Sequence, residues 1–344
     1  MTLLKVEDLT IQFKSRQGVV KAVDNLSFEL AKGISLGIVG ESGSGKSVTS
    51  LAIMRLLQNA NTEITGKIDF EGVDLLKLSP DEMRKIRGNS VSMIFQEPMT
   101  SLNPLHTCGK QIMEPILIHQ KGISKQEAKK RAIELLRLVG IPSPEQRFHE
   151  YPHQMSGGMR QRIMIAIALA CDTKLLIADE PTTALDVTIQ AQILDLMSKL
   201  KKQRDMSIIM ITHDLGVVKE MCENVVVMYT GQIVEKSPTD LVFKDPLHPY
   251  TKGLLNAIPK ISSKVERLEA IPGTVPDALR MPTGCSFHPR CKYATERCKA
   301  EKPPLYKRED GREVRCFIYD AGEKGDDGNV TNEFKEYSNS INPK

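Results

Sequence analysis

The fold of this chain is decided by the stretch Gly40-Glu41-Ser42-Gly43-Ser44-Gly45-Lys46-Ser47. It fits the pattern G-x-x-x-x-G-K-[ST], in which a glycine-rich loop surrounds the phosphates of a nucleotide. An apolar run at residues 34–39 precedes it as a buried strand, and residues 48–57 follow it as a helix. This context predicts a phosphate-binding loop rather than a simple Gly/Ser-rich turn.

The residue types of this loop match the chemistry of phosphate binding. Glycines let the backbone curl so that successive N–H groups face an anion at a helix N-terminus. Lys46 adds a point charge, and Ser47 offers its hydroxyl to Mg²⁺. We therefore expect the nucleotide to be held by Gly40, Ser42, Gly43, Ser44, Gly45, Lys46, Ser47 and Val48.

Length and composition exclude several classes of protein. A chain of 344 residues can hold a large core plus one or two smaller units. The net charge of +4, with 26% charged residues, is too mild for a nucleic-acid binder. No apolar run approaches the ~18 residues that span a bilayer, and the acidic N-terminus does not resemble a signal peptide. A cytosolic chain is expected, in which seven cysteines argue for metal or redox chemistry rather than disulfides.

Strand-like runs flank the loop and place two further side chains. Residues 3–13, 19–23 and 26–30 predict short strands that can form an antiparallel flap beside the nucleotide. Phe13 at a strand end could stack on a flat base, or be a core or edge aromatic. Residues 64–70 and 91–95 are also strand-like, and the second run leaves Gln96 at its carboxyl end before Pro98. Gln96 could ligate a metal or position a water, or be an ordinary surface residue.

The pattern turns helical from residue 99 to about residue 154. Ser124 and Glu127 form a capping box, and an apolar face follows until Gly140 and Pro142 end the helix. This region predicts an inserted helical subdomain that contacts a partner. Ser156-Gly157-Gly158 then offers a second set of free N–H groups before a helix. It indicates either that another subunit's nucleotide is clasped here or merely a flexible helix start.

Acids at a strand end supply the expected chemistry. The apolar run 174–178 ends in Asp179, placed to hold Mg²⁺ through water, and Glu180, placed to activate a water against the terminal phosphate. Another strand, 207–212, ends in His213. The carboxyl ends of parallel strands meet at the ligand-binding edge of a sheet, so His213 is expected to touch the terminal phosphate and the water.

In this order, the motifs closely resemble those of the ATP-binding subunit of an ABC transporter, over residues 3 to about 235. The resemblance implies an α/β fold: a P-loop NTPase (ABC ATPase) core with an antiparallel β flap, an inserted helical subdomain and a small C-terminal extension. It implies that Phe13 stacks on adenine, Ser47 and Gln96 ligate Mg²⁺, Glu180 is the general base and His213 senses the γ-phosphate. The signature segment departs from Leu-Ser-Gly-Gly-Gln at Met155 and Met159 but keeps the Ser-Gly-Gly step.

The resemblance also implies partners. Two ATPase subunits would form a head-to-tail dimer, each ATP lying between one phosphate loop and the other signature segment. The helical subdomain, with Gln96, Glu97 and Pro98, would receive a helix of a permease subunit on the cytoplasmic face of the membrane. The expected domains are residues 1–98 with 161–235 for the ATPase core, 99–160 for the helical signature subdomain, 236–320 for the C-terminal extension and 321–344 for a disordered tail.

The segment from Asp245 to Leu255 contains His248-Pro249-Tyr250. It resembles the extension of the dipeptide, oligopeptide and nickel branch of the family. The resemblance implies an importer with two permease subunits, an extracellular solute-binding protein and a paralogous ATPase as the other half of a heterodimer. A homodimer is the alternative for the isolated chain. A peptide importer is the main interpretation, and nickel or another small solute is the alternative.

Four cysteines follow close together: Cys285, Cys291, Cys298 and Cys316. Their spacings fit neither common zinc sites nor the bacterial ferredoxin run. The region resembles that of peptide-importer ATPases with an iron–sulfur cluster, which implies a [4Fe–4S] group; zinc and unliganded thiols are the alternatives. We expect the cluster's charge to be offset by Arg290, Lys292, Arg297, Lys299 and Arg315.

The other three cysteines, Cys108, Cys171 and Cys222, are expected to be small buried hydrophobes. A soluble ABC ATPase acting on nucleic acid or the ribosome is the alternative from another class. Such proteins usually carry two cassettes or a long coiled coil, and the sequence has neither.

Overall fold

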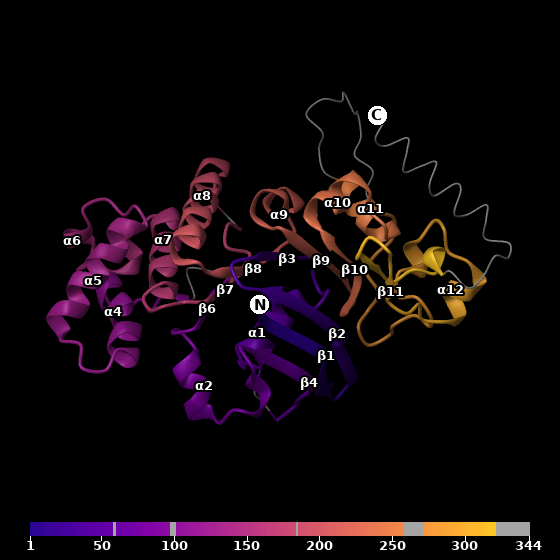
Figure 1. Ribbon diagram of the computed structural model, residues 1–344, viewed down its shortest axis with the longest axis horizontal. Helices are drawn as coiled ribbons and strands as arrows, with labels where there is room; N and C mark the ends of the chain where they lie inside the picture. Colours follow the sequence, from indigo (N-terminus) through magenta and orange to yellow (C-terminus); the bar gives the residue numbers. More distant parts are fainter. Residues whose placement is uncertain (58–59, 97–100, 184, 258–270, 321–344) are drawn as a thin grey trace.

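We describe a computed structural model of the chain over residues 1–57, 60–96, 101–183, 185–257 and 271–320. Predictions about Glu97, Pro98 and the tail from residue 321 lie outside the described residues. Figure 1 shows two sheets at the centre, a helical unit at one end and the cysteine-bearing segment at the other.

The larger sheet positions the phosphate loop. Within the described residues it has the order β11-β12-β10-β9-β3-β8-β7-β6, and β9, β3, β8, β7 and β6 run parallel. Its inner strands are continuous apolar runs because both faces are covered. The predicted strand at 207–212 is confirmed. The strands are β3 (Ser35–Val39), β6 (Val91–Ile94), β7 (Leu175–Asp179), β8 (Ser207–Thr212), β9 (Asn224–Tyr229), β10 (Gln232–Pro238), β11 (Tyr306–Lys307) and β12 (Glu313–Val314).

The smaller sheet is the predicted antiparallel flap, with the order β2-β1-β4-β5. The prediction of short strands was wrong, since residues 2–31 form only two long strands. Register shifts between Val6 and Leu9, and between Leu9 and Ile11, absorb the irregular stretch without ending the pairing. The strands are β1 (Thr2–Ser15), β2 (Gly18–Ala31), β4 (Thr62–Phe70) and β5 (Val73–Asp74).

Helices cover the parallel sheet and form the helical unit, which contains α4 to α7 (Figure 1). The predicted capping box is confirmed at the start of α5, where Ser124 Oγ accepts from the Glu127 N–H. The α-helices are α1 (Lys46–Ile53), α2 (Pro80–Ile86), α4 (Cys108–His119), α5 (Lys125–Leu138), α6 (Pro144–Arg147), α7 (Gly157–Ala168), α8 (Val187–Arg204), α9 (Leu215–Met221), α10 (Thr239–Lys244), α11 (Pro249–Asn256) and α12 (Glu296–Ala300). The 3₁₀ helices are η1 (Leu75–Lys77), η2 (Pro152–Gln154), η3 (His288–Arg290) and η4 (Phe317–Tyr319).

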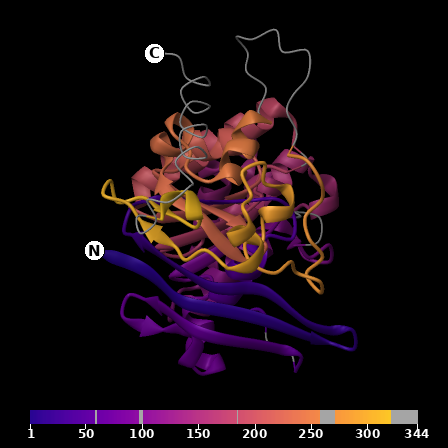
Figure 2. The ribbon, with the colours of Figure 1, turned by 90° about the vertical axis from the view of Figure 1, so that its right-hand side faces the viewer.

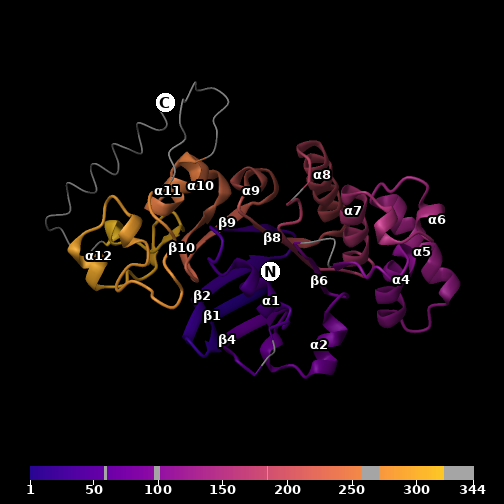
Figure 3. The ribbon, with the colours of Figure 1, turned by 180° about the vertical axis from the view of Figure 1, so that it is seen from behind.

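The cysteine-bearing segment continues the large sheet rather than forming a separate layer. Glu235 of β10 pairs with Val314 of β12, and β11 pairs with β12. Figure 3 shows this segment beside β10, on the opposite side of the molecule from α5, and Figure 2 shows it facing the viewer. Because the pairing spans about eighty residues of chain, local patterns could not predict it.

The remaining expectations concern burial. Cys108, Cys171 and Cys222 are buried in the core, as predicted. Burial raises the pKa of Cys108 to about 11 and that of Cys222 to about 12, so both stay thiols near neutral pH. No helix in the described part of the chain is both long and apolar enough to cross a membrane.

Candidate functional site

The phosphate loop connects β3 to α1 and needs its glycines. A Cβ on Gly40 would lie 2.2 Å from the Met228 carbonyl oxygen, and a Cβ on Gly45 would lie 2.5 Å from the Ala22 carbonyl oxygen. Gly45 also has a φ of 96°, in the left-handed region that favours glycine. The backbone of strands β2 and β9 therefore shapes the loop closely.

Two polar side chains of the loop are already oriented. The Lys46 ammonium donates to the carbonyl oxygens of Gly40, at 2.7 Å, and Glu41, at 3.0 Å. Burial lowers the pKa of Lys46, although nearby carboxylates oppose that shift. Ser47 Oγ donates to Asp179 Oδ1 at 3.1 Å, so two of the three residues predicted at the magnesium site are in direct contact.

Glu180 lies at the centre of the predicted catalytic group. Its carboxylate accepts a hydrogen bond from Gln96 Nε2 at 2.9 Å and another from Thr183 Oγ1 at 2.9 Å. His213 Nδ1 lies 3.2 Å from its other oxygen. Burial alone would raise the pKa of Glu180, but the contacts with His213 and Thr183 outweigh it and hold that pKa below its ordinary value. An ionised carboxylate at this sheet edge can accept a proton from water.

Asp179 differs from its neighbour. It is 4% exposed, and burial raises its pKa, which the hydrogen bond from Ser47 only partly offsets. A bound divalent cation would favour the ionised form of such a buried carboxyl group. The pair Asp179 and Glu180 therefore combines a buried ligand candidate with a more accessible, ionised base.

Two other residues predicted to contact a nucleotide are not part of the hydrogen-bonded group around Glu180. Ser156 caps α7 in the helical unit, with its Oγ accepting from the Met159 N–H, and α7 is apart from α1 in Figures 1 and 3. Phe13 lies on β1 opposite Val20 and packs partly against the core of the flap. Its stacking on a base stays a prediction.

Comparisons with known proteins agree with this geometry. The family described as "ABC transporter" matches residues 23–183. An oligopeptide transport ATP-binding protein of Bacillus subtilis, AppD, is 53% identical over 320 residues, which is 93% of this chain and 97% of that protein. The chain belongs to the ABC transporter ATP-binding family. It is an ATPase subunit coupled to transport, and the expected fold class is confirmed.

Further matches include the C-terminal region of this ABC ATPase as well as its ATPase core. The family described as "Oligopeptide/dipeptide transporter, C-terminal region" matches residues 234–298. A dipeptide transport ATP-binding protein of Escherichia coli, DppD, is 51% identical over 324 residues, 94% of this chain and 99% of that protein. A dimeric, post-hydrolysis structure of the ATP-binding cassette MJ0796 bound to ADP and Pi has a TM-score of 0.63 at 28% identity, over 69% of this chain and 99% of that one.

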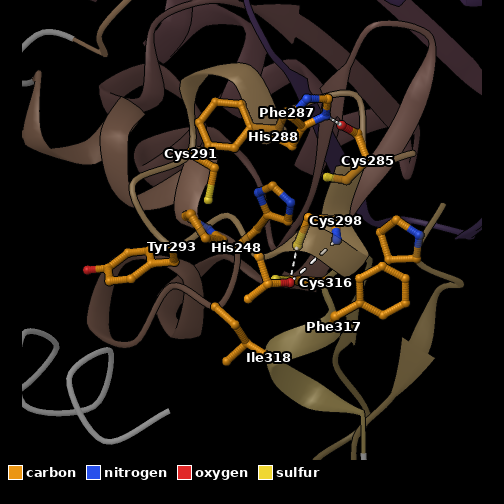
Figure 4. Close-up of a pocket in the computed structure, with 13 residues that line it drawn as sticks. His248, Cys285, Phe287, His288, Cys291, Tyr293, Cys298, Cys316, Phe317 and Ile318 are labelled. Carbon is orange, nitrogen blue, oxygen red and sulfur yellow. Dashed lines mark hydrogen bonds between the residues drawn. The ribbon is translucent and has the colours of Figure 1, made fainter. Parts of the chain in front are cut away.

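The four C-terminal cysteines of the ABC ATPase line one cavity. Cys285, Cys291, Cys298 and Cys316 surround it together with aromatic and aliphatic side chains (Figure 4). Burial raises the pKa of Cys291 to about 12 and also raises that of Cys316. Among the residues that the structure describes, no three His, Cys, Asp or Glu side chains come together closely enough to hold a metal ion. The thiols therefore line the cavity walls rather than converging on one point.

The predicted cationic collar is only partly present. Arg290 pairs with Glu41, Arg297 pairs with Glu301 and Asp320, and Lys299 pairs with Glu296, so a carboxylate already neighbours each of these three charges. Arg315 and Lys292 do act electrostatically on cysteines of the cavity. The prediction is wrong for Arg290, whose guanidinium contacts the phosphate loop instead, and it stays a prediction for Arg297 and Lys299.

Sequence reasoning missed two sets of contacts with the nucleotide site. Thr183 is the second of two threonines that follow the Asp179-Glu180 step, and proximity in sequence could have indicated it as a candidate. The contacts of Tyr250 and Arg290 with Glu41 join segments more than 200 residues apart. Tyr250 belongs to the recognised His-Pro-Tyr segment, but no pattern in the sequence pairs it with the phosphate loop.

Proposed function

We propose that this chain is the ATP-hydrolysing subunit of an importer for dipeptides and oligopeptides. Two observations support the substrate class: the match of residues 234–298 to the oligopeptide/dipeptide C-terminal region, and relatives named for peptide transport at 51% and 53% identity. Nickel or another small solute is the alternative cargo. Specificity belongs to the permease and the solute-binding protein, because the ATPase does not meet the cargo.

The hydrogen-bonded group around Glu180 carries the proposal for catalysis. Glu180 acts as general base, and His213 contacts the γ-phosphate and the attacking water. Ser47, Gln96 and Asp179 would hold Mg²⁺, which would offset the negative charge of the phosphates. The glycine-rich loop holds the phosphates through its N–H groups, and Phe13 stacks on adenine.

We further propose how the subunit is assembled. Residues 1–98 with 161–235 form the ATPase core, and residues 99–160 form the helical subdomain that faces a permease. Ser156, Gly157 and Gly158 contact the nucleotide held by a paralogous ATPase in a head-to-tail heterodimer. Two permease subunits and an extracellular solute-binding protein complete an importer in which this chain is peripheral on the cytoplasmic face. The dimer in the MJ0796 structure supports this arrangement.

Replacing Glu180 by Gln tests the catalytic role. In the complex reconstituted with its permease subunits, we expect steady-state ATP hydrolysis at this site to fall by about 10²–10⁴-fold, since a general base contributes that much. ATP binding should persist. Glu71→Gln is the matched control, because Glu71 pairs with surface lysines away from the site. Unchanged hydrolysis in Glu180→Gln would exclude this residue as the base.

Uptake assays test the transport role. Cells that carry Glu180→Gln should lose uptake of a labelled dipeptide while keeping the subunit in the membrane fraction. Loss of nickel uptake with intact peptide uptake would favour the alternative cargo. Co-purification of this chain with ribosomes or nucleic acid, instead of permease subunits, would contradict the importer.

We propose that the four thiols of the cavity hold a [4Fe–4S] cluster. Four metal atoms that each take one thiolate need ligands set apart around a cavity, whereas a single ion needs them converging at about 2.3 Å. The arrangement of Cys285, Cys291, Cys298 and Cys316 in Figure 4 suits the first case. The cluster would supply a structural or regulatory centre, because phosphoryl transfer needs no redox group.

Metal content tests the cluster. Protein purified without oxygen should contain iron and sulfide and absorb broadly in the visible. Cys291→Ala should reduce the iron and sulfide content and the visible absorption. Aerobically stable protein with zinc and no iron would exclude a cluster. Cys171→Ala is the matched control, because Cys171 is buried in the core rather than in the cavity.

A further inference from the structure

The C-terminal segment makes direct contact with the phosphate loop. Arg290 donates from Nη1 to Glu41 Oε2 at 2.7 Å and from Nη2 to Glu41 Oε1 at 3.1 Å. The Glu41 N–H donates to Tyr250 Oη at 2.8 Å. Both the side chain and the backbone of one loop residue are therefore held by segments that follow the ATPase core in the sequence.

The guanidinium of Arg290 is itself fixed. Its side chain is 4% exposed, and its Nε donates to the Pro272 carbonyl oxygen at 2.9 Å. The hydroxyl of Tyr229 lies 3.5 Å from Nη1. A buried Arg that makes two parallel bonds to a carboxylate specifies the position of that carboxylate well, because both partners are planar.

Three buried aromatic side chains pack together beside these contacts. Tyr229, Tyr250 and Phe287 are buried, with ring centroids 4.7 Å apart for the two tyrosines and 5.3 Å apart for Tyr229 and Phe287. Tyr229 ends β9, which flanks the phosphate-loop strand β3. Phe287 lies between Cys285 and Cys291 and lines the cysteine cavity (Figure 4). The cavity and the phosphate loop thus share one packed support.

We infer that Arg290 and Tyr250 are positioning residues that hold the phosphate loop in its ATP-binding conformation through Glu41. Gly40, Gly43 and Gly45 bring no side-chain contacts, so the loop is held by Lys46, by the backbone of β2 and β9, and by the contacts with Glu41. A loop ordered before ATP binds loses less entropy on binding, which raises affinity. The inference goes beyond the proposed function, and it requires neither the peptide cargo nor the cluster.

A double-mutant cycle tests this inference. Mg-ATP is titrated into the full-length chain, with Glu180→Gln as the common background so that ATP is not consumed. Glu41→Ala and Arg290→Met should each raise the Kd for ATP about tenfold, within the usual range of coupling between sites. The double variant should be no weaker than either single variant. Tyr250→Phe should raise the Kd less, because it removes one acceptor and keeps the ring.

Arg312→Met separates positioning from general stability. Arg312 is 5% exposed and pairs with Asp245 and Asp310 in the same C-terminal region, without contacting the phosphate loop. Arg312→Met and Arg290→Met should both lower the melting temperature, but Arg312→Met should leave the Kd for ATP within twofold of the parent. In the complex reconstituted with its permease subunits and without the background change, Glu41→Ala should raise the KM for ATP by a larger factor than it lowers kcat.

Two results would overturn the inference. One is a Kd within twofold of the parent in both Glu41→Ala and Tyr250→Phe, which keep the buried Arg290 and therefore do not depend on tolerance of its loss. The other is an equal loss of affinity in Arg290→Met and Arg312→Met, which would assign the effect to stability alone. Neither result bears on Glu180 as the base, so failure here is distinguishable from failure of the proposed ATPase mechanism.

Discussion

Side chains from several segments gather around the phosphate loop and, separately, around the cysteine cavity. At the loop, Ser47, Asp179 and Glu180 sit at strand ends and a helix start, and they are hydrogen-bonded to one another or to nearby polar groups. In the cavity, thiols come from irregular segments and the five-residue helix α12, and most of the lining is apolar. A sheet fixes the first group within narrow limits, whereas loops and local contacts fix the second.

The two regions also differ in how their surroundings affect the charge of their titratable side chains. At the loop, hydrogen bonds keep Glu180 ionised despite partial burial. In the cavity, burial raises the pKa of Cys285, Cys291 and Cys316, which favours neutral thiols. The candidate general base is therefore already ionised, whereas binding of a metal by the cavity thiols would release protons and would depend on pH.

The largest expected difference between the regions comes from glycine at the loop. Gly40→Ala would place a methyl group 2.2 Å from the Met228 carbonyl oxygen and 2.7 Å from Ser44 Oγ. We expect the loop to shift and ATP affinity to fall at least about 100-fold, or about 2.7 kcal/mol. Titration of Mg-ATP measures the loss. Gly122→Ala is the control, with a φ of 83° and open space around the added carbon; equal affinities in both variants would contradict the prediction.

The corresponding change beside the cavity should act on stability. Gly284 has a φ of 65°, and an added Cβ would lie 2.3 Å from the Cys298 carbonyl oxygen. Gly284→Ala should lower the free energy of unfolding by about 2–3 kcal/mol, since backbone strain and a clash with backbone combine. Chemical denaturation measures this. Affinity for ATP should fall less than in Gly40→Ala, and a greater fall would mean that the two regions are not distinct in this respect.

Low pH is expected to have a smaller effect on stability, through His248 at the edge of the cavity. Burial lowers the pKa of His248 from 6.5 to about 3, and its Nδ1 accepts from the Tyr250 N–H. The unfolded chain therefore binds the proton more tightly, so this contribution to stability is full above pH 6.5 and is lost as pH falls toward 3. At pH 5 the loss is about 2 kcal/mol.

His248→Asn is the variant that isolates this effect. Asn keeps a side-chain acceptor for the Tyr250 N–H but does not titrate. The free energy of unfolding is measured between pH 4 and 7 for both proteins. Parallel pH profiles for the parent and His248→Asn would show that His248 does not carry the acid sensitivity.

The smallest expected effect distinguishes the two kinds of cysteine. Cys222 is buried in the core against α9 and β3, so Cys222→Ala should cost only about 1 kcal/mol for the lost side-chain volume. Iron content should not change. A loss of iron in Cys222→Ala as large as that in Cys291→Ala would remove the distinction between core thiols and cavity thiols.

Several residues that the sequence predicts at the nucleotide site lie together in the structure, because they belong to contiguous motifs at strand ends. A phosphate loop, an Asp-Glu step and a strand-end His each carry their own local signal, and the parallel sheet then brings Glu180 and His213 within 3.2 Å. The length of β1 and β2 was not predictable, because bulges carry the pairing past residues such as Asp8 and Asn25 whose φ angles are positive.

Contacts between distant segments had no local signal at all. Glu41 and Arg290 are 249 residues apart in the chain, and either could equally be an exposed charge. The collar around the cysteines failed at Arg290 for a related reason: adjacency in sequence does not say where a long side chain ends. Arg290 was expected to face the thiols and instead contacts the phosphate loop.

The short strands β11 and β12 also protect the subunit from unwanted association. β10 is a seven-residue strand, and β12 pairs with it at Glu235 and Lys236. The new edge, β11, is only two residues long. A short edge offers few unpaired N–H and C=O groups to another chain. Cleavage before Tyr306 would uncover this side of β10 and create a template for β-strand addition, so integrity of the C-terminal segment guards against aggregation.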